Sequence, residues 1–181
     1  MKSSLFKFLI TLFVPLLILL GMIVKPIFSS LYGETIVLKT LPLDPTDLFY
    51  GDYVTLNLEI SEVSAEKVSS EVVHELRKNQ DDHFWGPTKQ IKVYTLLTKK
   101  EDVYEVDQVL LKKPEKGLYI KGKIPAYHYS TELPYYHIDY GIDRYYIEEN
   151  TGEKIEKQSQ TGDVKVVIKL ANGYGLIKEL Q

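Results

Sequence analysis

The sequence predicts an N-terminal transmembrane helix followed by a mainly antiparallel β domain with short helices, a fold of the α+β class. The first observation is an uncharged, strongly apolar run over residues 8–24. The second is that the chain beyond it consists of short runs rich in Val, Ile and Tyr, separated by turn residues and without alternating helices. We therefore expect two parts, a cytoplasmic N-terminus with its anchor in residues 1–32 and one extracytoplasmic domain in residues 33–181.

Charges flank the apolar run on both sides. Lys2 and Lys7 precede it and Lys25 follows it, and with its apolar neighbours the segment reaches the roughly 20 residues that a bilayer requires. The positive charges at the amino end outnumber the single one at the other end, which favours a cytoplasmic N-terminus. We expect a single-pass protein of the cell membrane that contacts the lipid bilayer through residues 8–24. The alternatives are a cleaved signal peptide, for which no small-residue cleavage site is present, and a buried helix of a soluble protein.

The composition excludes several classes of function. The chain has 181 residues, a formal net charge of −3 and no cysteine. Lysines and carboxylates are interspersed, so the chain lacks the basic surface by which a nucleic-acid-binding protein works, and we expect no nucleic acid partner. The absence of cysteine excludes disulfides, thiolate metal sites and thiol nucleophiles. No motif indicates a cofactor, and none is expected.

The domain begins with two predicted strands, residues 34–41 and 53–60. In the second, apolar residues alternate with polar ones, so one face belongs to the core. The intervening residues 42–52 contain Asp44-Pro45, which is typical of a capped helical turn, and a glycine before the chain extends again. One short helical turn is therefore expected between the strands.

A helix and three further strands follow. Val68, Val72 and Leu76 recur at helical spacing within residues 64–79, with Ser64 as the expected N-cap. Period-2 runs then predict strands, and these cover residues 89–97, 104–111 and 118–124.

The last third of the chain predicts a strand, a short helix and a hairpin. Residues 135–147 are predicted as one strand, in which Tyr136, Ile138, Tyr140 and Ile142 form a core face and alternate with Tyr135, His137, Asp139 and Asp143. Residues 153–159 follow a capping pattern and read as a short helix. Asn172-Gly173 lies between the apolar runs 163–170 and 174–180, and this dipeptide is the strongest short-range signal for a hairpin.

One block of the sequence resembles a known family. Residues 43–56 contain Gly51-Asp52-Tyr53 followed at the expected spacing by Leu56, which is similar to the hallmark of the GDYXXLXY family of small bacterial membrane-anchored proteins. Three later runs resemble later segments of that family in the same order, and they are residues 117–122, 140–146 and 152–156. Leu58 stands where the family name has its last Tyr, which keeps an inward-facing position and removes a hydroxyl. The helix predicted in residues 64–79 has no counterpart in the pattern.

The resemblance implies a membrane-anchored extracytoplasmic domain, often encoded beside multi-pass membrane proteins, and it assigns no catalytic residue. We therefore expect a non-catalytic binding or accessory module that acts with a multi-pass membrane protein or at the cell envelope. The candidate contact residues are the turn from Asp44 to Tyr53 and the Tyr-rich segment that follows residue 126, because tyrosine offers a large rigid surface with a polar end. The binding residues that we expect from these segments are Asp44, Asp47, Asp52, Tyr53, Arg144, Tyr135 and Tyr136.

Two alternatives compete with a contact surface. Three carboxylates in one turn are also a possible hard-cation site, although Asp44, Asp47 and Asp52 serve equally well as helix caps and turn residues. His137 and Asp139 share one face of the predicted strand, which makes them weak candidates for a metal site. An envelope hydrolase or metal-dependent enzyme would use Asp52, Glu148, His137 and Asp139. Such an enzyme requires these side chains to converge in one concave site.

Overall fold

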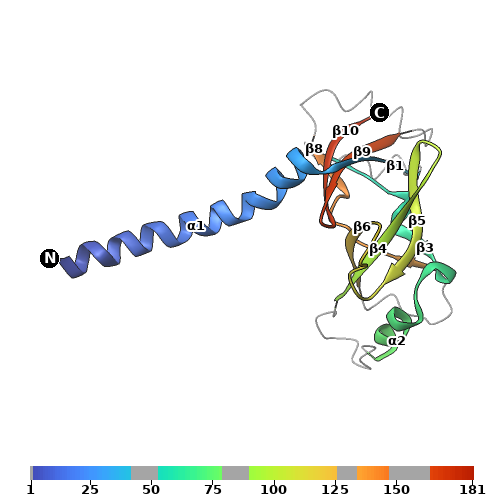
Figure 1. Cartoon of the computed structure of the whole chain (residues 1–181), viewed down its shortest axis with the longest axis horizontal. Coiled ribbons are helices and arrows are strands. Elements are labelled where there is room, and N and C mark those ends of the chain that lie inside the picture. The colour runs from blue at the N-terminus through green and yellow to red at the C-terminus, as the bar shows by residue number, and fades with distance from the viewer. Residues whose placement is uncertain (1, 42–52, 79–89, 126–133, 147–163) are drawn as a thin grey trace.

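A long N-terminal helix projects from a β domain (Figure 1). The computed structural model describes residues 2–41, 53–78, 90–125, 134–146 and 164–181. The helical turn predicted in residues 42–52 and the helix predicted in residues 153–159 lie outside these ranges. The described part contains an apolar helix and a mainly antiparallel domain, so the predicted fold class is confirmed.

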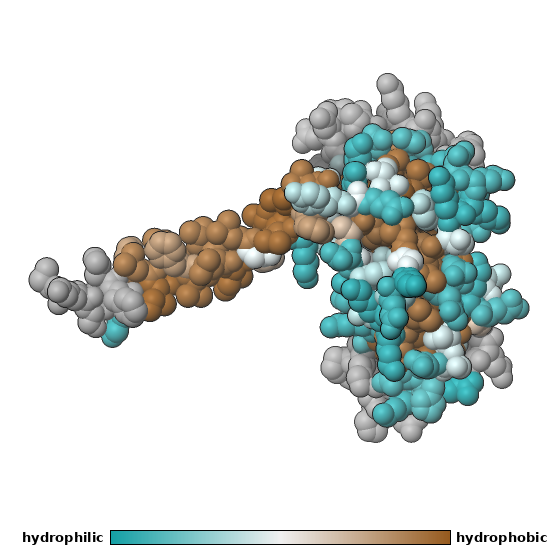
Figure 2. All heavy atoms as spheres, viewed as in Figure 1, coloured by the Kyte–Doolittle hydropathy of each residue, from teal (hydrophilic) through white to brown (hydrophobic). Residues whose placement is uncertain are grey.

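Helix α1 (Lys2–Tyr32) carries the apolar run. Its large apolar side chains from Phe8 to Val24 are exposed, and Figure 2 shows them as a continuous hydrophobic surface along the projecting helix. The segment Lys7–Tyr32 is long and apolar enough to cross a membrane, and a signal sequence has the same properties. The helix continues through both of its prolines, Pro15 and Pro26.

The first sheet begins directly after this helix. Its strand order is β1 (Glu34–Lys39), β9 (Lys165–Ala171) and β10 (Tyr174–Leu180), all antiparallel. The turn between β9 and β10 places Asn172 at φ 51° and Gly173 at φ 77°. Two positive φ angles match the twist of a two-residue hairpin, so the predicted Asn-Gly hairpin is confirmed.

The second sheet has the order β5-β4-β6 and is also antiparallel. It consists of β4 (Gln90–Lys100), β5 (Val103–Leu110) and β6 (Leu118–Pro125). Along β4 the side chains alternate between exposed and buried, as a sheet with one face on the core requires. All three predicted strands are present, and β4 extends beyond its predicted end before it turns back into β5.

Two short antiparallel ribbons complete the domain. Strand β2 (Tyr53–Thr55) pairs with β8 (Arg144–Tyr146), and β3 (Glu62–Ser64) pairs with β7 (Tyr135–His137). The inward positions predicted in residues 53–60 are confirmed for Leu56, Leu58 and Ile60, which are all buried. That strand is nevertheless shorter than predicted, because β2 ends at Thr55 and the chain then passes through an isolated bridge at Leu58 into a 3₁₀ turn, η1 (Glu59–Ser61).

The strand predicted over residues 135–147 is wrong as a single strand, because the chain turns between β7 and β8. The Asp139 carboxylate accepts a hydrogen bond from the Gly141 N–H at 2.8 Å, and Gly141 adopts φ 67°. An aspartate that bonds the backbone two residues on, followed by a left-handed glycine, favours a turn. Alternation still predicted the core side chains, since Tyr136, Ile138 and Ile142 are buried.

Helix α2 (Ser70–Lys78) is shorter than the predicted helix. Ser64 precedes only a 3₁₀ turn, η2 (Ala65–Lys67), and its side chain makes no capping hydrogen bond. Val68 then forms a bridge with Val109 of β5, which holds the chain extended before the helix begins. The predicted apolar face is confirmed for Val72 and Leu76, which are buried on α2, whereas Val68 is buried from the extended segment before the helix.

One hydrophobic core joins the two sheets, the ribbons and α2. Its largest fully buried side chains are Ile36, Leu38, Leu76, Ile120, Ile124, Ile138 and Ile168. Glycine is required where the chain after β7 crosses β6, because a Cβ on Gly122 would lie 2.5 Å from the Ile138 side chain. The core thus extends from the base of α1 to the α2 end of the domain.

Tyr140 provides the polar link across this core. Its hydroxyl donates to the Ile60 carbonyl at 3.0 Å and lies 2.9 Å from the hydroxyl of Thr95, which is fully buried and donates to it. These two bonds connect the turn after β7 to η1 and β4. Burial raises the pKa of Tyr140 above that of an ordinary phenol, and the hydrogen bond with Thr95 offsets a part of this rise.

We predict that Tyr140→Phe lowers the free energy of unfolding by about 1–3 kcal/mol, because the buried Thr95 hydroxyl and Ile60 carbonyl lose their common partner. Urea unfolding of the detergent-solubilised chain, followed by near-ultraviolet circular dichroism, measures this change.

Tyr146→Phe is the matched control, since it removes a hydroxyl from a side chain that is 73% exposed. It should change the same free energy by less than about 0.5 kcal/mol. Equal effects of the two substitutions would contradict a structural role for the Tyr140 hydroxyl.

Candidate functional site

Two of the predicted binding residues, Tyr53 and Arg144, meet on the β2–β8 ribbon. The register pairs Tyr53 with Tyr146 and Thr55 with Arg144. Because side chains two residues apart share one face of a strand, these four side chains lie on the same side of the ribbon. The pairing brings together residues that are about 90 positions apart in the sequence.

Three of these side chains form a contiguous surface, which we call the Tyr-Arg patch and define as Tyr53, Arg144 and Tyr146. The ring centroids of Tyr53 and Tyr146 are 5.9 Å apart, with an interplanar angle of 60°. The Arg144 Cζ atom lies 5.4 Å from the Tyr53 ring centroid, and its Nε atom is 3.8 Å from a carboxylate oxygen of Asp143. Tyr53 is half-buried, while Tyr146 and Arg144 are exposed.

The chemistry of this patch suits contact with another molecule. Tyrosine and arginine are enriched at the centres of protein interfaces, where flat rings and a planar guanidinium bury much surface. The cation–π contact and the loose ion pair are solvent-exposed and contribute about 1 kcal/mol or less each to stability.

The other two tyrosines among the predicted binding residues lie elsewhere. Tyr135 of β7 is exposed and lines a small cavity of about 150 Å³ beside η1, η2 and β5. Tyr136 points the opposite way, into the core, where it is 8% exposed. The strand alternation itself places Tyr136 inward, and a buried ring is unavailable for contact with a partner. Tyr135 is therefore the exposed member of this pair, and it is separate from the Tyr-Arg patch.

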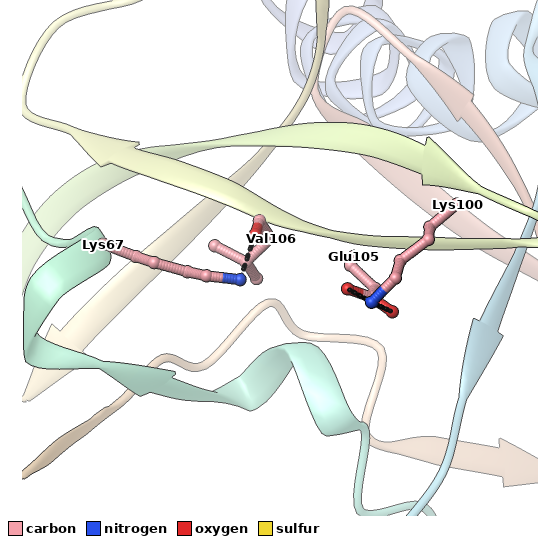
Figure 3. A network of polar contacts seen from close by, with 4 residues as sticks. All are labelled: Lys67, Lys100, Glu105 and Val106. Carbon is pink, nitrogen blue, oxygen red and sulfur yellow. Dashed lines mark hydrogen bonds and ion pairs between the residues drawn. The ribbon is translucent and has the colours of Figure 1, made fainter.

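Polar side chains beside the Tyr135 cavity form contacts between neighbouring elements of the fold (Figure 3). The Lys67 ammonium donates to the Val106 carbonyl at 2.7 Å, which ties η2 to β5. Lys100 and Glu105 form an ion pair at 3.3 Å across the β4–β5 hairpin. At the start of β5, the Tyr104 hydroxyl donates to the Glu34 carboxylate at 3.0 Å, and burial together with this carboxylate raises the pKa of Tyr104.

The residues proposed for an enzyme do not assemble in the described part of the chain. His137 is exposed on β7, and the Asp139 carboxylate is engaged with the Gly141 N–H. Among the described residues, no three His, Asp or Glu side chains lie together as a metal site. Asp52 and Glu148 lie outside the described residues, as do Asp44 and Asp47.

The sequence did not predict the contacts between the end of α1 and the domain. Ser29 is fully buried, and its hydroxyl donates to the carbonyl of Lys169 at 2.8 Å, with the Tyr174 carbonyl at 3.1 Å. The Lys169 ammonium donates to the Gly33 carbonyl at 3.2 Å. A Cβ on Gly33 would collide with the Ser29 carbonyl and would lie 3.0 Å from the backbone nitrogen of Leu170, so the chain just after α1 runs close against the backbone of β9.

The sequence carries only a weak sign of this junction. A serine at the end of an apolar run is ordinary in a membrane-flanking segment, and nothing local connects Ser29 with the β9–β10 hairpin. Tyr146 was also missed as a member of the patch, because its contact with Tyr53 depends on strand pairing.

Comparison with known proteins gives one match. A family model described as GDYXXLXY protein matches residues 15–180, which is nearly the whole chain. No curated protein and no solved structure matches it. The match covers both the second half of α1 and the β domain, including the residues of the Tyr-Arg patch.

We predict that Arg144→Ala and Tyr146→Ala each change the free energy of unfolding by less than about 1 kcal/mol, because both side chains are exposed and their contacts are weak. Urea unfolding provides the measurement. Tyr136→Ala, which empties a core position, should cost about 3–5 kcal/mol in the same assay. A loss of more than about 2 kcal/mol for Arg144→Ala would instead make the patch part of the structural framework.

Proposed function

The chain belongs to the GDYXXLXY protein family, and from this membership and the exposed apolar helix we propose that it is a membrane-anchored, extracytoplasmic binding or accessory module. Its partner is a multi-pass protein of the same membrane. The Tyr-Arg patch is the described part of the contact surface. The observation that carries this proposal is the continuous apolar surface of α1 on a helix that is fixed to a folded domain.

The surface of α1 supports membrane insertion. Contiguous exposed apolar surface of this extent is rare on soluble proteins and marks a site covered by lipid or protein. Between Lys7 and Lys25 the helix rises about 27 Å, which is close to the thickness of the hydrocarbon core of a bilayer. The two lysines therefore lie at the two boundaries of the apolar region, where their charges are solvated.

The junction at Ser29 supports an uncleaved anchor. Cleavage by a signal peptidase would remove or expose Ser29, whose hydroxyl is hydrogen-bonded to β9 and β10. Loss of a fully buried, hydrogen-bonded group destabilises the part that remains. A cleaved leader has no need for such contacts with the mature domain, whereas an anchor gains a fixed orientation from them.

The position of the patch supports a partner in the same membrane. Gly141 lines a cavity against the end of α1, and Arg144 follows three residues later. Three residues span at most about 11 Å, so the patch lies close to the base of the anchor. A surface there is within reach of the extracytoplasmic loops of a neighbouring membrane protein. No observation on the described residues favours the alternative of an envelope enzyme.

We predict a single-pass topology with the domain outside. The chain has no cysteine, so a single Lys116→Cys substitution in the exposed β5–β6 turn gives one thiol without background. A membrane-impermeant maleimide should label this thiol in intact cells, and it should label Ser3→Cys only after lysis. The reverse pattern would overturn the orientation, and a shortened chain without residues 1–28 would overturn the anchor.

We predict that a photo-crosslinking amino acid in place of Tyr146 forms an adduct with a multi-pass membrane protein in cells. Interface arginines often contribute about 2 kcal/mol or more, so Arg144→Ala in the same chain should reduce the adduct about tenfold or more. Immunoblotting and mass spectrometry of the purified adduct measure both effects.

Arg77→Ala is the matched control, because Arg77 is exposed on α2, at the end of the domain away from α1 (Figure 1). It should leave the Tyr146 adduct unchanged. An adduct that persists in Arg144→Ala, or the absence of any membrane-protein adduct at Tyr146, would overturn the patch as the contact surface.

A further inference from the structure

A cavity of about 420 Å³ lies where α1 meets the β9–β10 hairpin. One wall is the C-terminal part of α1, with Val24, Lys25 and Phe28. The opposite walls are the Asn172-Gly173 turn with Tyr174, and the segment at Tyr140 and Gly141 beside Lys121 of β6. The size is within the range of pockets for small organic ligands, roughly 300–1,000 Å³.

Two lysines give this cavity its charge. Lys25 of α1 and Lys121 of β6 come from distant parts of the sequence and both line the cavity, and both residues are exposed. Within the described part of the chain, neither ammonium group forms an ion pair. The rest of the lining is mostly apolar or backbone. The cavity therefore combines two lysines with a mostly apolar lining.

The level of the cavity in the membrane follows from the anchor, and this step rests on the proposed membrane insertion. With Lys7 at the inner boundary, Lys25 lies about 27 Å further along the helix, at the outer boundary of the hydrocarbon core. The remaining helix to Tyr32 rises about 10 Å more, which carries it through a headgroup layer of roughly 5–8 Å. The cavity is thus at the height of the phosphates of the outer leaflet.

We propose that this cavity binds the headgroup of an anionic phospholipid from the outer leaflet. Lys25 and Lys121 hold the phosphate and its neighbouring oxygens, and the glycerol and upper acyl chains lie against Phe28 and Val24. A lipid reaches the cavity laterally, because α1 is both a wall of the cavity and the surface that contacts the bilayer. Charge, apolar lining and membrane height all match this one ligand class.

The full-length chain in nanodiscs of equal parts phosphatidylglycerol and phosphatidylcholine provides the test. Native mass spectrometry after release counts the lipids that stay bound. We expect phosphatidylglycerol adducts to exceed phosphatidylcholine adducts about fivefold or more. Lys25→Gln and Lys121→Gln should each lower this ratio about fivefold, since a lysine near an anionic lipid surface contributes about that factor in binding.

Lys92→Gln is the matched control, because Lys92 is exposed on β4 and does not line the cavity. It should leave the ratio unchanged. Phe28→Ala should lower the retention of both lipids, which tests the apolar wall without a change of charge. Near-ultraviolet circular dichroism of each variant establishes that the domain is folded.

Three results would overturn the lipid site. They are an equal retention of the two lipids by the wild-type chain, an unchanged ratio in the folded lysine variants, and displacement of the lipid by millimolar glycerol phosphate. The last result would assign the cavity to a soluble phosphate ligand. The intact mass in the same spectra separates failure of the lipid site from failure of the anchor. A chain without its first 28 residues overturns both the anchor and the lipid site. A complete chain without a lipid preference overturns the lipid site alone.

Discussion

The buried hydroxyl of Ser29 is the contact on which the arrangement of this protein depends. It connects the last turns of an apolar helix to the carbonyl oxygens of β9 and β10, at a point where Gly33 allows two backbones to approach without a side chain between them. Because the helix ends in the sheet and not in a linker, the domain has a defined orientation relative to α1. Both the patch and the cavity derive their position from this contact.

The interior of the domain connects the junction at α1 to the rest of the molecule. Tyr140 lies beside the junction cavity, and its hydroxyl joins η1 and the central strand β4. The next residue, Gly141, turns the chain toward β8 and the Tyr-Arg patch. One short segment therefore links the base of the anchor, the polar centre of the core and the proposed contact surface. In a small domain few residues lie far from the surface, so one segment can contact several such features.

The members of the Tyr-Arg patch could be predicted from the sequence only in part. Tyr53 and Arg144 were predicted as binding residues from separate motifs. Only the β2–β8 register places the Arg144 Cζ atom 5.4 Å from the Tyr53 ring centroid and adds Tyr146 to the patch. Alternation predicted correctly that Tyr136 faces the core, which removes it from any contact surface. No local pattern connects Lys25 with Lys121, because the cavity that they share is formed by segments about 100 residues apart.

The sequence by itself determined the features that depend on neighbouring residues. These are the apolar helix, the inward faces of the strands, the apolar face of α2 and the Asn-Gly hairpin, because each follows from side-chain periodicity or from the φ angles that a residue tolerates. The tertiary structure alone decided where the strand at Thr55 stops, why α2 begins at Ser70 and how α1 joins the sheet. Those outcomes depend on distant backbone partners, such as Val109 for Val68, which compete with local preference and which no short stretch of sequence specifies.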